Sequence, residues 1–313
     1  MASLTDTESS YEEGPIVPLV DGRLYLLPNP YRLDGRVCTH PPDASGWASQ
    51  NCYLFVENDR AVLVDTGFSI HEASMLSRLE EIITPDMTLE VSVLRLGEYY
   101  GSCNVRPIVE RFGVQKVYSA RRDGVESTDF RPDHVPWGTP TGTGSFATVE
   151  KVQMRGNGSI EMGVDRTMSL VKPPLRLLST NWLYDAGTRT LLTADMFTHS
   201  WLDQPDGPWV SSPDEAVPSA AEVRAFMVGT RYWWLPGSRT AQMVVDLHQI
   251  FDQYEVDRIA PGFGLVIEGS ELVKEHVRIL SEVLEVFSSE PATGVDAGYT
   301  AKSTKRAPMA AAR

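Results

Sequence analysis

Residues 51–67 read NCYLFVENDRAVLVDTG. Two runs of β-branched and aromatic residues flank the polar turn Glu57-Asn58-Asp59, a pattern typical of a β-hairpin. The second run ends at Asp65-Thr66-Gly67. We therefore expect two paired, buried strands here, followed by a tight polar turn.

The segments after this hairpin predict an α/β fold. Residues 69–87 place apolar side chains at helical spacing and contain a helix that stops before Pro85. Residues 91–96 have a strand pattern, residues 104–113 a helical pattern closed by Gly113, and residues 114–120 a further strand pattern. Alternation of strand, helix and strand is typical of α/β domains.

The second half of the chain begins with hairpins and ends with helices. After the Gly-, Pro- and Thr-rich residues 121–160, which we expect to form loops, two hairpins are predicted in 159–174 and 181–195. Helical patterns follow in 222–236 and 238–254, then a short strand in 258–264 and an amphipathic helix over 270–289.

Both ends of the chain differ in composition from the middle. Residues 1–14 are rich in Ser, Thr and Glu, and residues 291–313 are small and polar without apolar periodicity. Such segments cannot bury enough apolar surface to fold. We expect two disordered tails around a single domain that spans residues 15–290.

Charge and composition exclude several classes of partner. The chain has 42 acidic and 28 basic side chains and a net charge of −14, which repels phosphate backbones and anionic lipid. The N-terminus lacks the basic start and apolar stretch of a signal peptide. The 3 cysteines form no CxxC pair. We expect a cytoplasmic protein with neither nucleic acid nor membrane as a partner.

The order of these segments resembles the metallo-β-lactamase fold, and in detail the lactamase-type domain of flavodiiron and oxygen-binding di-iron proteins. Residues 51–67 are similar to the opening hairpin of that family. Residues 182–197, WLYDAGTRTLLTADMF, resemble its hairpin that ends in the bridging metal-ligand Asp, and residues 259–264, IAPGFG, stand where the family has a Pro-Ser-His-Gly-like end. The resemblance implies a four-layer αββα sandwich with its site at one edge of the two sheets.

The resemblance also implies a degenerate metal site. The family holds two metal ions with a His-x-His/Glu-x-Asp-His loop, a later His, an Asp and a final His. The corresponding positions of this chain are Arg95, Gly97, Tyr99 and Tyr100 in the loop, then Arg176, Asp195 and Phe263. Only Asp195 is a usual ligand, and one carboxylate cannot assemble a site of three or four ligands. We therefore expect no bound metal and no cofactor.

Two interpretations of the altered site are open. In the first, Asp195 pairs with Arg176 or Arg95 and acts as a structural plug. In the second, the arginines bind and polarise a substrate while Tyr99 or Tyr100 donates a hydrogen bond. Glu98, between the altered positions, is either a general base or a solvated loop residue. The candidate catalytic set is Arg95, Glu98, Tyr99, Tyr100, Arg176 and Asp195.

Three further residues are candidates for binding a substrate. His199 lies four positions after Asp195, and Trp201 opens an aromatic-rich stretch that also holds Trp233 and Trp234. Aromatics of this kind line pockets for flat ligands, form subunit interfaces or pack in the core. Phe263 stands at the position of the family's final His. We expect His199, Trp201 and Phe263 to contact a substrate.

The resulting functional hypothesis is a metallo-β-lactamase-fold component of a hydrolase that acts on a small aromatic ester or ether. In this hypothesis the chain is a degenerate subunit paired with a related, metal-bearing chain. Two alternatives are a stand-alone metal-free hydrolase that uses an Arg/Tyr pocket, and a ligand-binding sensor without chemistry.

Overall fold

The predicted hairpin forms β3 (Trp47–Glu57) and β4 (Arg60–Val64), which pair antiparallel around a turn at Asn58. Asn58 has a φ of 53°, a left-handed conformation that Asn tolerates better than most residues. Both strands are almost entirely buried because each face of their sheet is covered. The computed structural model describes residues 11–95, 99–121, 148–175, 179–211 and 217–290.

The first sheet has seven strands in the order β1-β2-β3-β4-β5-β6-β7. Its first four strands pair antiparallel, and β4 to β7 pair parallel. The strands not yet named are β1 (Val17–Val20), β2 (Leu24–Arg32), β5 (Thr88–Val93), β6 (Lys116–Ser119) and β7 (Glu150–Gln153).

The second sheet has the order β12-β14-β13-β11-β10-β9-β8. Within it, β11 pairs parallel with β13, and the hairpin of β10 and β11 lies next to β9. Its strands are β8 (Ser159–Glu161), β9 (Thr167–Val171), β10 (Trp182–Asp185), β11 (Thr190–Ala194), β12 (Val210–Ser211), β13 (Arg258–Pro261) and β14 (Val266–Glu268).

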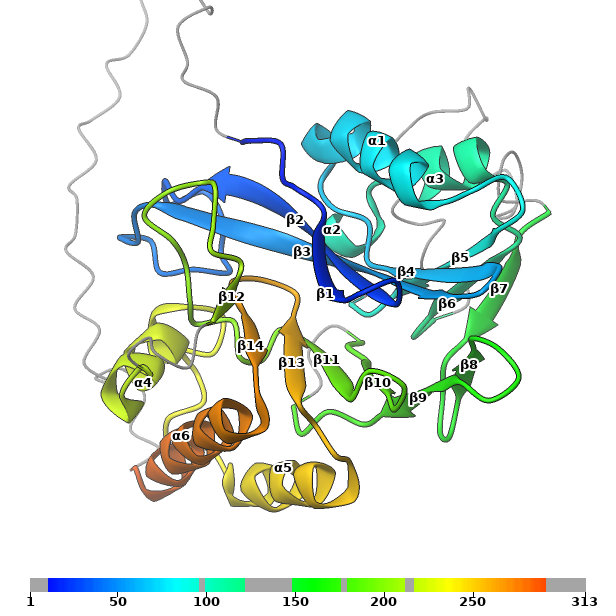
Figure 1. Cartoon of the computed structure of the whole chain (residues 1–313). Helices are drawn as coiled ribbons and strands as arrows, with labels where there is room; N and C mark the ends of the chain where they lie inside the picture. Colours follow the sequence, from blue (N-terminus) through cyan, green and yellow to red (C-terminus); the bar gives the residue numbers. More distant parts are fainter. Residues whose placement is uncertain (1–10, 96–98, 122–147, 176–178, 212–216, 291–313) are drawn as a thin grey trace, which may run out of the picture.

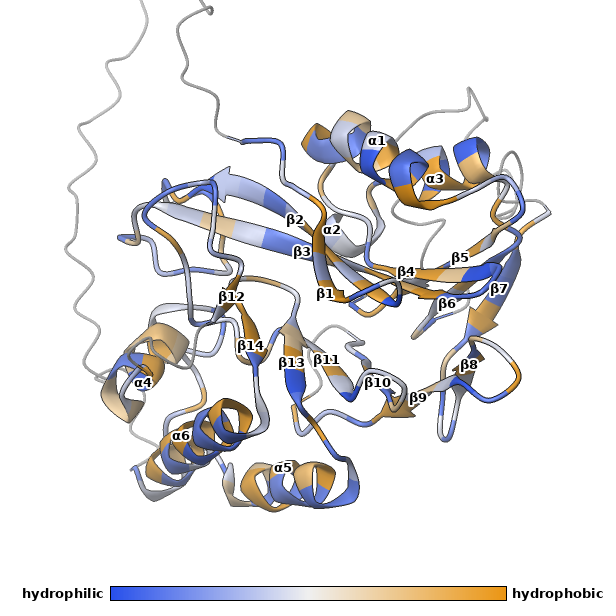
Figure 2. Cartoon of the chain, viewed as in Figure 1, coloured by the Kyte–Doolittle hydropathy of each residue, from blue (hydrophilic) through white to orange (hydrophobic). Residues whose placement is uncertain are grey.

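Helices cover the outer face of each sheet (Figure 1). The first sheet carries α1 (Glu72–Ile82), which follows the short η1 (Ser69–His71), together with α3 (Val105–Phe112). The second sheet carries α4 (Ala220–Gly229), α5 (Ala241–Gln253) and α6 (Ser270–Ser289). Figure 2 shows hydrophobic and hydrophilic sides on α5 and α6, as expected of helices that cover a sheet.

The alternation of side chains along β3 assigns its residues to two cores. Cys52 and Leu54 pack against α1 and α3, whereas Tyr53 and Phe55 pack between the sheets, against residues such as Leu192 of β11. A third core lies between the second sheet and α4 to α6. The four-layer αββα sandwich predicted from the sequence is confirmed.

The structure differs from the sequence expectations at the edges of the domain. Residues 11–14 were expected to belong to the disordered N-terminal tail, but Tyr11 forms a β-bridge with Tyr31 and its ring contacts that of His71. Tyr11 is therefore held against the body by backbone pairing and a ring contact. The edge strands β1, β7 and β12 and the short strand β14 beside β12 lacked a distinctive pattern and were missed. The other tail residues, 1–10 and 291–313, lie outside the described residues.

Among the described residues, no helix is long and apolar enough to span a membrane.

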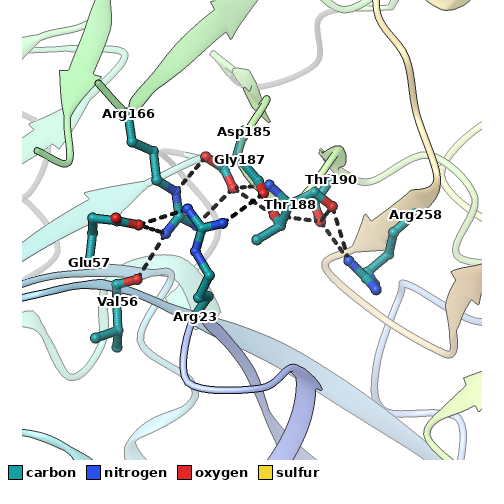
Figure 3. Close-up of polar contacts among 9 residues, drawn as sticks. All are labelled: Arg23, Val56, Glu57, Arg166, Asp185, Gly187, Thr188, Thr190 and Arg258. Carbon is teal, nitrogen blue, oxygen red and sulfur yellow. Dashed lines mark hydrogen bonds and ion pairs between the residues drawn. The ribbon is translucent and has the colours of Figure 1, made fainter. Parts of the chain in front are cut away.

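A buried charge cluster connects the two sheets through Arg166, in the turn between β8 and β9 (Figure 3). Arg166 donates two hydrogen bonds to Asp185 of the second sheet, at 2.9 and 2.8 Å, and reaches the carboxylate of Glu57 in the first sheet at 2.7 Å. Arg23 also binds Glu57. Asp185 is fully buried, so its charge depends on these partners.

We predict that Arg166→Met lowers the free energy of unfolding by about 3–5 kcal/mol, because Asp185 would remain buried without its cation. Urea denaturation followed by circular dichroism measures the change. The control is Arg189→Met, which removes a pair between Asp257 and a half-exposed arginine and should cost less than about 1 kcal/mol. Equal effects of the two substitutions would contradict the prediction.

Candidate functional site

The site lies where strands of the two sheets end side by side. Asp195 directly follows β11, and Arg95 lies two residues after β5. Arg95 forms a β-bridge with Thr180, and the backbone N–H of Asn181 donates to the carbonyl of Leu94 at 2.8 Å. The end of a strand in the first sheet is thus joined to the start of β10 in the second.

The backbone around Asp195 is conformationally unusual. Ala194 and Phe197 have φ values of 49° and 65°, and Asp65, at the end of β4, has a φ of 59°. Residues other than glycine rarely adopt this region, and such residues cluster at functional sites. The conformation of Ala194 and Phe197 holds Asp195 in a turn against the end of the sheet.

The Asp195 carboxylate accepts hydrogen bonds from four described side chains. Its Oδ1 accepts from Arg95 Nη1, from Arg231 Nη1 at 2.8 Å and from the hydroxyl of Tyr100 at 3.1 Å. Its Oδ2 accepts from the hydroxyl of Thr180 at 3.3 Å. The backbone carbonyl of Asp195 accepts from the hydroxyl of Tyr232 at 3.0 Å. The pairing with Arg95 that was considered from the sequence is present, whereas Arg176 lies outside the described residues.

Burial strengthens these contacts. Arg95 is 1% exposed and Asp195 5% exposed, so water screens their attraction weakly. Burial and the negative charge of Asp195 raise the pKa of Tyr100 well above its usual value, which keeps its hydroxyl protonated as a donor.

A second carboxyl group, Asp65, lies close to this cluster. It is buried, and its Oδ1 accepts from the backbone N–H of Leu94 at 2.9 Å. The pKa of Asp65 is raised to about 7, mainly by burial and to a smaller extent by the charge of Asp195, against the lowering effects of the Leu94 hydrogen bond and the charge of Arg95. At pH 7 Asp65 is therefore close to the midpoint of its titration.

Phe263 completes the wall of the cluster. It is fully buried, its ring centroid lies 4.5 Å from that of Tyr100, and the guanidinium carbon of Arg231 lies 6.0 Å from the ring. The structure thus brings together four of the predicted site residues, namely Arg95, Tyr100, Asp195 and Phe263. Their role toward a substrate stays a prediction.

The remaining predicted catalytic residues are placed less fully. Tyr99 begins the short α2 (Tyr99–Ser102), and its side chain is outside the described part of the structure. Glu98 and Arg176 lie outside the described residues altogether. Their predicted roles stay predictions.

His199 and Trp201 lie in a neighbouring layer of aromatic side chains. The Nε2 atom of His199 is 3.3 Å from Nδ1 of His276 on α6, and burial lowers the pKa values of these two residues to about 3 and about 4. Trp201 is 36% exposed and stacks on Phe226 of α4, with 6.2 Å between ring centroids. The imidazoles of His199 and His276 are both neutral at pH 7.

A small cavity separates this layer from Asp195. It measures about 20 Å³ and is lined by Asp195, His199, Phe226 and Tyr232, among others. A volume of this size holds one water molecule and excludes an aromatic substrate. Of the two residues, only His199 lines this cavity. The substrate contacts of His199 and Trp201 stay predictions.

Sequence reasoning missed three residues of the cluster. Arg231 directly precedes the aromatic run Tyr232-Trp233-Trp234, but nothing in that run indicated a guanidinium aimed at Asp195. Asp65 was recognised only as part of a turn. Thr180 carried no signal, because its position depends on the bridge to Arg95.

The donor set does not fit the pair of metal ions that the resemblance implies. Within the described ranges, no group of three or more His, Cys, Asp and Glu side chains could hold a metal ion. Asp195 already accepts from two guanidinium groups, and at about 4 Å each would repel a divalent ion by roughly 8 kcal/mol at an effective dielectric constant near 20. The described residues favour an ion-pair cluster in place of a metal centre.

We predict that Arg95→Met destabilises the protein by about 3 kcal/mol, because it removes a buried partner of Asp195 that Arg231 replaces only in part. Arg111→Met is the matched control, since Arg111 pairs with Glu80 on the surface and its loss should cost less than about 1 kcal/mol. Urea unfolding of both variants measures the difference. A cost for Arg95→Met no larger than the control's would show that the pair does not stabilise the fold.

We predict a pH-dependent effect of Asp65→Asn. The folded-state pKa of about 7 lies above the unfolded value, so the native state binds the extra proton between about pH 4 and pH 7. The stabilisation that the wild type gains from this bound proton is lost as pH rises through that window. The variant has no such proton and shows no such loss. The free energy of unfolding of the variant relative to wild type should rise by a few kcal/mol from pH 4 to pH 7, measured by urea unfolding at each pH. A constant difference would contradict the prediction.

Comparisons with known proteins bear on the fold. Neither a protein-family model nor a curated protein sequence matches this chain. Among solved structures, it is similar to rubredoxin oxygen:oxidoreductase from Desulfovibrio gigas, with 15% identity and a TM-score of 0.61 over 87% of this chain and 62% of that one. The Flv1 flavodiiron core from Synechocystis matches with 15% identity and a TM-score of 0.61 over 88% of this chain and 62% of that one.

A fragment of a diflavin flavoprotein from Nostoc matches with 13% identity and a TM-score of 0.61, over 87% of this chain and 96% of the fragment. This chain spans less than two thirds of the length of the first two proteins. Identities this low establish the fold alone. The chain has the metallo-β-lactamase fold, in the form found in the core of flavodiiron proteins.

Proposed function

We propose that this chain is a metal-free, supporting subunit of an enzyme whose metal site is carried by a related lactamase-fold chain. The observation that carries the proposal is the engagement of Asp195 by both Arg95 and Arg231. An aspartate held in this way is a poor metal ligand, because a cation would have to displace two charge-assisted hydrogen bonds in a buried site.

The size of the site supports a subunit over a stand-alone hydrolase. The cavity of about 20 Å³ beside Asp195 has room for one water molecule but not for an aromatic ester as well. The buried hydroxyl of Tyr100 already donates to Asp195, so it would have to leave that bond to reach a substrate. The described geometry thus favours the structural interpretation of the ion pair.

The reaction of the complete enzyme has two candidates. The hypothesis from the sequence is hydrolysis of a small aromatic ester or ether by the metal-bearing partner. Redox chemistry is the second candidate, because one similar structure is named an oxygen:oxidoreductase and others are named flavodiiron proteins. In either case the part played by this chain would be to complete or stabilise the partner's pocket.

We predict that the chain isolated from its own cells carries no stoichiometric iron, zinc or manganese and co-purifies with a second lactamase-fold chain that does. Native mass spectrometry with elemental analysis reports both properties in one preparation. Iron and flavin in the second chain would favour redox chemistry, and zinc alone would favour hydrolysis.

Two results would contradict this proposal. One is stoichiometric metal in this chain that is lost in Asp195→Asn. The other is turnover of an aromatic ester such as 4-nitrophenyl acetate by the purified chain alone, with loss of turnover in Tyr100→Phe, which would support the stand-alone hydrolase instead.

A further inference from the structure

We propose that His40 is the hydrogen-bond donor of a binding site for a planar aromatic compound that carries an acceptor oxygen, such as an ester or ether. His40 lies in the connection between β2 and β3, outside the segments from which site residues were predicted. This inference rests on the proposed function in that it names the class of ligand bound beside the Asp195 cluster.

The first observation is a box of aromatic rings around the His40 imidazole. The ring centroids of Trp201 and Phe226 lie 5.8 and 5.9 Å from it, and those of Tyr31 and Phe263 each lie 6.4 Å away. All four contacts are edge-to-face, at distances typical of favourable aromatic pairs. If one of these side-chain rings moves out, a flat ligand ring can take its place.

The second observation is that the Nε2 atom of His40 is buried without a hydrogen-bond partner among the described residues. The residue is only 3% exposed. A buried polar atom without a partner costs about 1–3 kcal/mol, and native proteins rarely keep one without a reason. An oxygen atom of a ligand beside Nε2 would remove this cost.

The hydrogen-bond network around His40 indicates that Nε2 is a donor. The Tyr31 hydroxyl lies 3.3 Å from the hydroxyl of Thr39, which lies 3.0 Å from Nδ1 of His40. If Tyr31 donates to Thr39 and Thr39 donates to Nδ1, only the Nε2 proton lacks a partner. The reverse direction would leave two groups unsatisfied, the Tyr31 hydroxyl proton and the Nε2 lone pair. Burial lowers the pKa of His40 to about 4, so the ring is neutral at pH 7.

Trp201 is the ring that a ligand can replace. It is 36% exposed, whereas Tyr31, Phe226 and Phe263 are buried. Two backbone hydrogen bonds between Trp47 and Leu202, at 2.6 and 2.7 Å, fix the neighbouring backbone beside β3. The indole of Trp201 can therefore rotate outward without loss of these backbone bonds. A ligand ring can then stack on Phe226 in its place.

The box is continuous with the Asp195 cluster. Phe263 contacts both His40 and Tyr100, and Tyr100 donates to Asp195. Phe226 lines the small cavity that also touches Asp195. A ligand in the box would thus be separated from Arg231 by one aromatic ring, that of Phe263. Sequence reasoning named Trp201 and Phe263 as substrate contacts, but not His40 or Phe226.

The test is a ¹⁹F NMR titration of the full chain with two probes of similar size, methyl 4-fluorobenzoate and 1-ethyl-4-fluorobenzene. We expect the ester to bind the wild type about tenfold more tightly than the hydrocarbon, since only the ester can accept from Nε2. His40→Phe keeps a ring but lacks the donor and should abolish this tenfold preference. Trp201→Ala should bind both probes more tightly, because no indole has to be displaced.

His248→Phe is the matched control, because His248 is an exposed histidine on α5 that lines the large open groove between α5 and α6. The His248→Phe variant should keep the wild-type preference for the ester. Loss of that preference would assign the probes to the groove between α5 and α6 and overturn the proposal. Equal affinity of the two probes for wild type, or an unchanged preference in His40→Phe, would overturn it as well.

If His40→Phe does not fold, the ¹⁵N resonance of Nε2 in the wild type replaces it. The ester should shift this resonance and the hydrocarbon should not, and the absence of a shift at saturating ester would refute the site. The metal content and the co-purifying chain decide the proposed function separately, so either idea can fail alone.

Discussion

Burial of the Asp195 carboxylate at the junction of the two sheets is the constraint on which the site depends. The carboxylate follows β11, where the unusual conformations of Ala194 and Phe197 fix its position. An unpaired charge at 5% exposure would be costly, so the fold needs cations nearby. Arg95 comes from the end of the first sheet and Arg231 from the segment after α4, and both reach the same oxygen atom. The ion pairs therefore join a strand end of each sheet and the helical layer.

The same constraint explains why this member of the fold has no suitable metal donor set among its described residues. The positive charge that balances Asp195 is supplied by covalently attached guanidinium groups, which do not need to be captured from solution. Tyr100 and Thr180 satisfy further lone pairs of the carboxylate. A cluster completed in this way stabilises the sheet junction without an ion, and substitutions at the other ligand positions then carry no cost in metal affinity.

A second buried cluster has a comparable role at the other end of β10 and β11. Arg166 connects the fully buried Asp185 of the second sheet to Glu57 of the first, and Arg23 adds a further cation. The apolar core between the sheets lies between these two charged ends. Non-directional apolar packing alone would allow the sheets to slide, whereas directional ion pairs at both ends specify one relative position.

The sequence by itself determined the fold, and through the family resemblance it predicted the loss of the metal ligands. The hairpin of residues 51–67, the helices at 69–87 and 270–289 and the Asp195 hairpin follow from local periodicity and turn residues, which short-range physics dictates. Comparison of residue types at the family's ligand positions was enough to predict that only Asp195 is a usual metal ligand. Its pairing with Arg95 was among the alternatives because both flank the same expected site.

Only the tertiary structure decided which groups surround Asp195. Arg231 is 36 positions away in the sequence and Tyr100 is 95 positions away, and no local pattern encodes a contact across such separations. The raised pKa of Asp65 depends on burial and on the charge of Asp195, and the unpartnered Nε2 of His40 depends on rings from several separate segments. Distance, burial and the absence of water are properties of the folded packing, so they become visible only once the two sheets and their helices are in place.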